Sequence, residues 1–569
     1  MNLQSFQIKL LDFLSEDPNT SALYGLDKNL GELPDPGKNA RIKKQGKLKM
    51  LKHALGLIDT QNFTRDEAID YRLCELTLES QRLYYELEID GAPQNMRMPR
   101  ATEHITDPIF LFFTNDPREV KYRIVNILSR LEKVDQYLTS YKKNIIGPVK
   151  RWVHIEIEQI DGTPDFFNNI LAWAKDNKFK NILRLESAIA KANTAFASYK
   201  EFLKNIDKTD NIFLGHEQLS LILKSRGIEQ NTKQLHQIAT EFTAKNHSEV
   251  SKLQQKLIKK YSLDSTTSVH ELQNFLNKKY QVKREGTDFS YILKRYKSEK
   301  KQILDFIEEH DLFPIVENED MSFIQTPGFL VPTIPAGAMM PPLPFREGKK
   351  TSLIYLTINE ELLQEHTEIS IPSMMIHEGI PGHHLQYAWG TTHNSPIRKI
   401  FNANDLSEGW ATMLEDYIFE KGYKSELADE IRFSNKRDIA RIGARVAIDL
   451  YFMSGEKKFL KIGVDCDLSS NDPFEAATHL LKAVTGFSDA RAAAEINWYS
   501  QERGYPLSYL TGNHLVWALK NKFTQQSTKI SSSDELSEDS RNKIEREFHK
   551  RLLTAGNMPV SLLEKFFCD

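Results

Sequence analysis

The spacing of apolar residues is the strongest constraint on the fold of this chain, because it follows a helical period through most of the first 310 or so positions. Gaps of three and four residues place apolar side chains on one face of a helix, and helices of this kind pack against one another. One such series consists of Ile124, Ile127, Leu128, Leu131, Val134 and Leu138. The spacing therefore predicts a mostly α-helical protein.

The charges are nearly balanced, with 75 Lys and Arg against 78 Asp and Glu in 569 residues. A chain without a basic excess has no overall field to hold nucleic acid or anionic lipid, so we expect neither nucleic acid nor a membrane as a partner. No run of 18 apolar residues occurs, and the mean hydropathy is −0.48. The three cysteines are far apart, and no secretory signal is visible at the start. We therefore expect a soluble, cytoplasmic protein.

The pattern changes after about residue 315. Residues 327–344 contain six prolines, which exclude a regular helix, and residues 351–359 (TSLIYLTIN) have the β-branched side chains of a strand. Helical spacing then resumes. We expect two lobes of one fold: an N-terminal helical lobe over residues 1–315, and a second lobe over residues 316–569 with a Pro-rich loop and a small antiparallel sheet. The candidate catalytic and metal-binding residues all lie in the second lobe.

A cluster of histidines follows the predicted strand. Residues 373–389 read SMMIHEGIPGHHLQYAW, and His383 and His384 stand six and seven positions after His377. The common helical zinc motif H-E-x-x-H spaces its histidines four residues apart, and here Pro381 occupies that position. The cluster therefore cannot bind a metal in the usual helical way.

A break in the helix would solve this problem. On a straight helix, position i+6 is turned about 240° from position i, and position i+7 lies about 10.5 Å along the axis. Pro381 lacks the N–H that would bond to the carbonyl of His377, and Gly382 tolerates unusual dihedral angles. We predict a bulge or break at this pair, which returns His383 to the side of His377.

A third ligand is expected from another helix, and Glu408 is the candidate, 25 residues after His383. Two histidines and one glutamate are a standard catalytic zinc set that leaves a position open for water. Gly409 would permit close helix approach, and Glu415 or Asp416 could hold the imidazoles from behind. An isolated His-Glu pair usually has no metal role, but three histidines within eight residues, a helix breaker and an acidic helix together favour a metal site. Neither a P-loop nor a GxSxG motif occurs.

The segment HEGIPGHHLQ, residues 377–386, resembles the H-E-x-x-P-G-H-x-x-Q signature of the bacterial family called domain of unknown function 885. The segments LGHEQLSLILKSRG (214–227), EGWA (408–411) and SYLTG (508–512) also resemble this family and follow the expected order. The family is mostly helical and is thought to be related to gluzincin metallopeptidases, so the resemblance implies a large, helical, metallopeptidase-like fold.

The resemblance also implies site residues. The metal ligands are His377, His383 and Glu408, and the general base is Glu378. Among the residues around the ligands we place His384, which occupies a free position of the signature, together with Glu415 and Gln386.

We predict a zinc-dependent hydrolase of amide or peptide bonds, with one Zn²⁺ ion, acting on short peptides in the manner of a carboxypeptidase or dipeptidase. Tyr509, or as second choice Tyr499, would stabilise the oxyanion. Arg445 or Arg503 would receive a substrate carboxylate, although a structural ion pair is as good an interpretation of each. The strand that ends at Asn359 would bind an extended peptide along its edge.

Three alternatives stay open. The same scaffold could act on a non-peptide amide or a modified amino acid. The chain could be a non-catalytic binding protein that uses a helical cleft. Two histidines and a carboxylate also describe non-haem iron sites, although the adjacent Glu378 favours zinc. The sequence does not determine the oligomeric state.

Overall fold

Helices make up most of the protein, as the apolar spacing predicts. The computed structural model describes residues 1–326, 337–530 and 537–567. It divides into two compact units: the first unit comprises Met1–Ser225, Leu343–Glu347 and Ser395–Ile400, and the second comprises Arg226–Pro342, Gly348–Asn394 and Phe401–Asp569. No helix in the described ranges is both long and apolar enough to cross a membrane.

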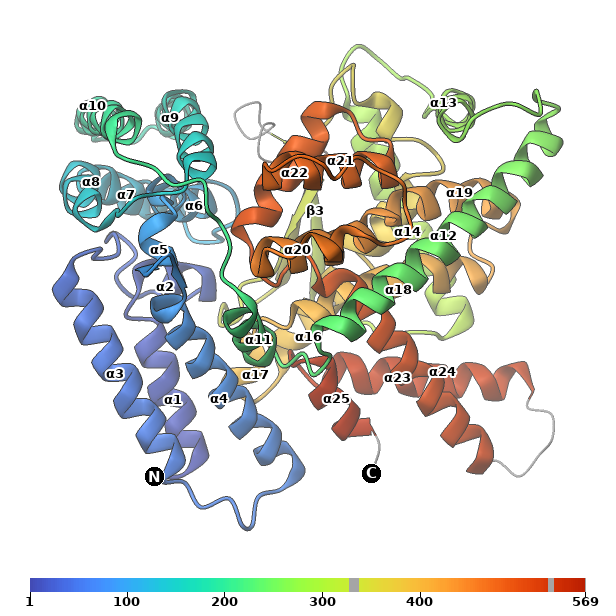
Figure 1. Cartoon of the computed structure of the whole chain (residues 1–569), viewed down its shortest axis with the longest axis horizontal. Coiled ribbons are helices and arrows are strands. Elements are labelled where there is room, and N and C mark those ends of the chain that lie inside the picture. Colours follow the sequence, from blue (N-terminus) through green and yellow to red (C-terminus); the bar gives the residue numbers. More distant parts are fainter. Residues whose placement is uncertain (327–336, 531–536, 568–569) are drawn as a thin grey trace. The chain divides into compact units, whose positions relative to one another are not determined.

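The first unit consists of helices and one two-stranded antiparallel ribbon, β1–β2 (Figure 1). Its elements are α1 (Leu3–Leu14), α2 (Pro18–Tyr24), α3 (Lys38–Gly56), α4 (Arg65–Glu86), β1 (Glu88–Ile89), β2 (Ala92–Pro93), α5 (Gln94–Arg97), α6 (Ala101–Thr114), α7 (Val120–Leu131), α8 (Val134–Tyr141), α9 (Lys150–Asp176), α10 (Ile182–Asn205), α11 (His216–Ser225) and α17 (Pro396–Ile400).

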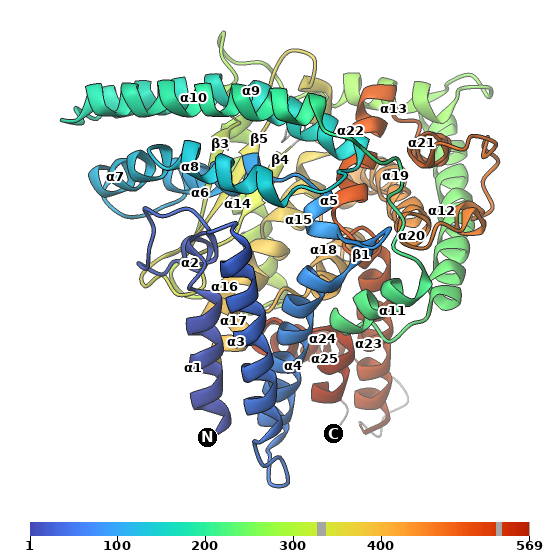
Figure 2. The same ribbon diagram turned by 60° about the vertical axis from the view of Figure 1, so that its left-hand side comes forward.

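Two groups of helices form the core of this unit. Helices α1, α3 and α4 lie side by side, and the long helices α9 and α10 run beside each other (Figures 1 and 2). The six apolar residues of the predicted series are all buried, but a turn at residues 132–133 divides them between α7 and α8. A capping box of Thr64 and Glu67 begins α4, since each side chain bonds the other residue's backbone N–H.

The second unit carries the candidate site. Its elements are α12 (Thr232–Tyr261), α13 (Val269–Lys279), α14 (Ser290–His310), β3 (Glu319–Gln325), β4 (Gly337–Met340), β5 (Lys350–Leu356), α15 (Ile371–Glu378), α16 (His383–Thr392), α18 (Asn404–Glu420), α19 (Ala428–Ile439), α20 (Arg441–Ser454), α21 (Pro473–Thr485), α22 (Asp489–Gln501), α23 (Ser508–Ile530), α24 (Glu538–Thr554) and α25 (Val560–Phe567).

The division between units differs from the predicted lobe boundary at residue 315. Residues 226–315 belong to the second unit, because α12 packs against α19 and α20, and α14 packs against α15 and β3. The buried face of α12 includes Leu235, Ala239 and Leu257. Local periodicity identifies such a face but does not say which helices cover it.

A three-stranded sheet stands beside the candidate site, in the order β3-β5-β4. β5 pairs antiparallel with β4 but parallel with β3, so this sheet is mixed rather than purely antiparallel as predicted. β5 ends at Leu356, three residues before the predicted end of the strand. The Pro-rich segment lies outside the described residues from 327 to 336.

Candidate metal centre

The helix breaks between the two histidines, as the Pro-Gly pair predicts. α15 ends at Glu378, residues 379–382 form a turn, and α16 begins at His383. Gly382 leaves no room for a side chain, since a Cβ atom there would lie 2.0 Å from the carbonyl oxygen of His377. The turn brings the two imidazole rings to 4.8 Å between centroids.

The three predicted ligands meet at one point. Candidate ligand atoms of His377, His383 and Glu408 all lie within 4.8 Å of one another. Oε2 of Glu408 is 3.8 Å from Nε2 of His377 and 3.4 Å from Nε2 of His383. Within the described ranges this buried oxygen has no hydrogen-bond partner. A buried carboxylate oxygen that faces two ring nitrogens fits a divalent cation, and the donor set is the one that zinc prefers.

Glu415 contacts the ring nitrogen of His377 that does not face Glu408. Its Oε1 is 2.6 Å from Nδ1 of His377, which leaves Nε2 directed toward Glu408. Burial alone would lower the pKa of His377, but the hydrogen bond and the charge of Glu415 outweigh it and raise the pKa to about 9. A carboxylate on the second ring nitrogen is the usual arrangement behind a metal-binding histidine. The other candidate, Asp416, pairs with Lys436 instead.

The helix that carries Glu408, α18, touches α23 at two glycines. A Cβ atom on Gly409 would lie 2.3 Å from the carbonyl carbon of Gly512, and one on Gly512 would lie 1.9 Å from the carbonyl oxygen of Asp405. The predicted role of Gly409 in close helix approach is confirmed. Burial would raise the pKa of Glu408, but the imidazoles of His383 and His377 lower it to about 2, so the carboxylate is ionised.

Tyr505, which the sequence pattern did not indicate as a site residue, also contacts Glu408. Its hydroxyl donates a hydrogen bond of 2.8 Å to Oε1 of Glu408 and lies 3.4 Å from the hydroxyl of Tyr509. Tyr509, the predicted oxyanion donor, is therefore linked through Tyr505 to the predicted ligand Glu408, and burial raises the pKa of Tyr509, so that its hydroxyl stays a donor. The only sequence signal for Tyr505 was its position four residues before Tyr509.

The matching sequence family has the description "Bacterial protein of unknown function (DUF885)", and it covers residues 18–566. This chain belongs to the DUF885 family. The expected resemblance is thereby confirmed at the level of the family. No curated protein sequence matches the chain.

Two solved structures have the fold of this DUF885 protein. One is a candidate lipoprotein of unknown function from Shewanella oneidensis, 17% identical, with a TM-score of 0.75 over 100% of both chains. The other is a candidate lipoprotein from Colwellia psychrerythraea, 15% identical, with a TM-score of 0.78 over 99% of this chain and 97% of the other. At these identities the likeness concerns the fold alone.

In the DUF885 chain, the side chains of Arg445 and Tyr499 are hydrogen-bonded to each other. The guanidinium of Arg445 donates from Nε to the hydroxyl of Tyr499 (2.9 Å) and from Nη2 to Glu495 (2.9 Å), and Tyr499 donates to the same carboxylate. The guanidinium of Arg445 also lies over the ring of Tyr509, 4.2 Å from the ring centroid. Of the two interpretations of Arg445, the structural ion pair is the one observed, and the hydroxyl of Tyr499 is already engaged.

The other two predicted substrate-binding residues, Arg503 and Asn359, also interact with neighbouring residues of the protein. Arg503 is 6% exposed and lies near Asp449, and burial lowers its pKa to about 10. Asn359 lies beyond the end of β5, where its Oδ1 accepts the N–H of Leu362 at 2.9 Å and closes a turn. Asn359 is therefore engaged within its own turn.

The second histidine of the His-His pair points away from the ligands. His384 is fully buried, with Nδ1 2.7 Å from the hydroxyl of Ser352 on β5 and Nε2 2.8 Å from Glu319 on β3. It ties α16 to the sheet, so His383 rather than His384 is the histidine that lies with His377 and Glu408. Gln386 is also buried, and neither atom of its amide has a hydrogen-bond partner in the described ranges.

β5 cannot add a peptide strand, contrary to the prediction. Over residues 353–356 it is paired with β3 on one side and with β4 on the other, so both of its hydrogen-bonding edges are used. The sequence pattern identifies a strand but not its place in the sheet.

Glu378 stands next to the first ligand and is half-buried. Its negative charge acts on three neighbours of the site, raising the pKa of His377, Tyr387 and Tyr509. These are smaller contributions than burial, but they mean that the charge of the predicted base acts on His377 and on the predicted oxyanion donor Tyr509.

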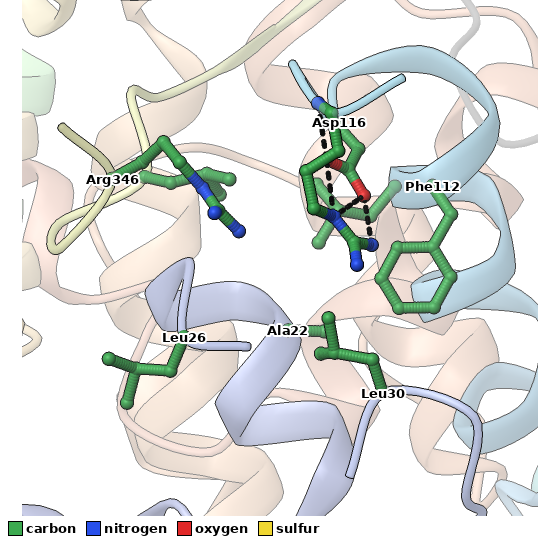
Figure 3. Close-up of a pocket in the computed structure, with 9 residues that line it drawn as sticks. Ala22, Leu26, Leu30, Phe112, Asp116 and Arg346 are labelled. Atoms are coloured by element: carbon green, nitrogen blue, oxygen red, sulfur yellow. Dashed lines mark hydrogen bonds and ion pairs between the residues drawn. The ribbon is translucent and has the colours of Figure 1, made fainter. Parts of the chain in front are cut away.

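A small hollow in the first unit is a weaker candidate for ligand binding (Figure 3). Its lining includes Leu26, Phe112 and Arg346, and Asp116 pairs with Arg118 at one side. It has no interior space for even a water molecule, so we regard it as a packing defect.

Proposed function

We propose that this DUF885 protein is a zinc-dependent hydrolase of amide or peptide bonds that acts on short peptides, as a carboxypeptidase or dipeptidase does. The observation that carries the proposal is the convergence of His377, His383 and Glu408, where a buried carboxylate oxygen of Glu408 has no hydrogen-bond partner among the described residues, with Glu378 next to His377 in the sequence. A divalent ion held by these three residues would supply polarisation of a carbonyl group and a water of lowered pKa.

The protein's own groups then have distinct roles. Glu378 accepts the proton of the attacking water and later donates it to the leaving amine. Tyr509 donates a hydrogen bond to the carbonyl oxygen as negative charge develops there. Glu415 keeps the ring of His377 in one orientation, and Tyr505 does the same for the carboxylate of Glu408.

The test compares Glu378→Gln with the wild type on a panel of dipeptides and acyl-amino acids, with metal content measured in each preparation. We expect Glu378→Gln to keep its metal and lose at least about 100-fold in kcat, equivalent to about 2.7 kcal/mol. Glu360→Gln is the matched control, since Glu360 is exposed and pairs only with Arg284 in the described ranges.

Other outcomes identify the alternatives. Turnover of acyl-amino acids but not of dipeptides would favour a non-peptide amide. No turnover of any substrate by the metal-loaded wild type would favour a binding protein. Stoichiometric metal that survives both His377→Ala and His383→Ala would contradict the ligand assignment, and iron as the retained metal would contradict zinc.

A further inference from the structure

Arg441 and Arg445 stand one turn apart on the same face of α20, but within the described ranges only Arg445 uses its Nε and Nη2 donors for contacts with other side chains. Arg445 is bonded to Tyr499 and Glu495, and its side chain is 7% exposed. The side chain of Arg441 is 22% exposed, and its Nη1 pairs with Asp438, 2.7 Å from Oδ2 and 2.7 Å from the backbone oxygen. The described ranges supply no partner for Nε or Nη2 of Arg441.

The charge of Arg441 interacts with two acidic residues near the candidate metal centre. Burial and the charge of Arg445 would lower the pKa of Arg441, but the charge of Asp438 and, to a smaller extent, the charges of Glu495 and Glu415 raise it. Glu415 is the group that contacts His377 at 2.6 Å.

A second line of contacts leads from the metal ligands to α20. Glu408 accepts from Tyr505, whose hydroxyl is 3.4 Å from that of Tyr509, and the ring of Tyr509 stacks on the guanidinium of Arg445. The partly exposed Arg441 is the next cation along the same face, one helical turn away.

We infer that Arg441 binds a carboxylate group of the substrate through its Nε and Nη2 edge, with Asp438 holding the guanidinium in place. Two parallel N–H donors match the two oxygens of a carboxylate, which makes the contact directional as well as strong. This inference rests on the proposed function and specifies it, because it makes the free carboxyl end of a short peptide the recognised feature. It also transfers the role predicted for Arg445 to Arg441, whose Nε and Nη2 have no partner among the described residues.

The test measures binding without turnover, by calorimetry on the full-length, metal-free protein. The probes are Ala-Phe, its amide Ala-Phe-NH2, and Ala-Glu-NH2, which carries only a side-chain carboxylate. We expect Arg441→Gln to bind Ala-Phe about 10- to 100-fold more weakly than the wild type and the amide with unchanged affinity. Arg441→Lys should retain part of the affinity, because it keeps the charge and loses the paired donors.

Arg551→Gln is the matched control, since Arg551 also lies in a local ion pair on a helix, with Glu547 four residues earlier. Circular dichroism establishes that each variant is folded. If Arg441→Gln weakens Ala-Glu-NH2 rather than Ala-Phe, the carboxylate comes from a substrate side chain, and the role of Arg441 stands.

The failure of this inference is distinguishable from the failure of the proposed function. Selective loss of carboxylate binding in Arg441→Gln supports the inference even if no metal-loaded preparation hydrolyses a peptide. Equal binding of Ala-Phe by the wild type and Arg441→Gln overturns it even if hydrolysis is observed, and so does a wild type that binds none of the probes.

Discussion

The hydroxyl of Tyr505 donates a 2.8 Å hydrogen bond to Oε1 of Glu408, and the other carboxylate oxygen, Oε2, faces His377 and His383. One oxygen is thus held by the protein and the other is presented to the imidazoles. This division orients Glu408 before any ion binds.

Removing the Tyr505 hydroxyl should weaken metal binding. We expect Tyr505→Phe to bind zinc about 10- to 100-fold more weakly, because Glu408 loses the contact that fixes its orientation. Competition with a chelator of known affinity measures this. Tyr417→Phe is the control, since Tyr417 lies on the same helix as Glu408 and donates to Glu545 at 2.8 Å. Equal zinc affinity in the two variants would mean that Tyr505 does not position the ligand.

The two neighbouring histidines should behave differently when each is replaced by asparagine. His383→Asn should leave less than about 0.1 zinc per chain at a free zinc concentration that saturates the wild type, because a three-ligand site loses one donor. His384→Asn should keep about one zinc per chain and lower the stability by about 2 kcal/mol, because it disrupts buried contacts to Ser352 and Glu319. Elemental analysis and thermal unfolding check the pair, and the reverse pattern of metal content would make His384 the ligand.

The glycine contact between α18 and α23 should not tolerate a methyl group. Gly512→Ala should destabilise the protein by about 3 kcal/mol or more and reduce zinc binding, because its Cβ atom would lie 1.9 Å from the carbonyl oxygen of Asp405. Gly162→Ala, in the middle of α9, has nothing within 4 Å of the added atom and should stabilise by about 0.5–1 kcal/mol. Denaturant titration measures both, and a neutral Gly512→Ala would show that the helices separate at no cost.

Glu156 should make the stability of the first unit depend on pH. Burial raises the pKa of this carboxyl to about 7 in spite of hydrogen bonds from Thr102. Because the folded state keeps the proton after the unfolded state has released it, stability should fall as pH rises from about 4.5 to about 7 and then level off. Glu156→Gln does not titrate, so its stability relative to the wild type should increase over this interval, by roughly 3 kcal/mol at most.

Thermal unfolding of the wild type and Glu156→Gln at pH 5, 6, 7 and 8 tests this dependence. Glu158→Gln is the control, since Glu158 is 61% exposed on the same helix. Parallel pH profiles for the wild type and Glu156→Gln would contradict the assignment of the shifted pKa to Glu156.

Local sequence was enough to predict that the helix breaks between His377 and His383 and that the two imidazoles come together. The break between Glu378 and His383 depends on Pro381 and Gly382, whose restrictions act within a few bonds of the backbone. The close approach at Gly409 follows from the absence of a side chain. Helical spacing likewise predicted the mostly helical fold, since the apolar period of a helix can be recognised in its own sequence without identifying the helices that pack against it.

Only the tertiary structure decided what depends on distant partners. Arg445 and Arg441 are both arginines and lie four residues apart. Tyr499 and Glu495 accept hydrogen bonds from Arg445, whereas Nε and Nη2 of Arg441 have no partner among the described residues. The pairing of β5 on both sides, the assignment of residues 226–315 to the second unit and the contact of Tyr505 with Glu408 have the same origin. The amino-acid sequence by itself determined the helices, the kinked turn and the donor types. Which polar groups are already satisfied depends on side chains brought together from far along the chain, and this only the folded structure decides.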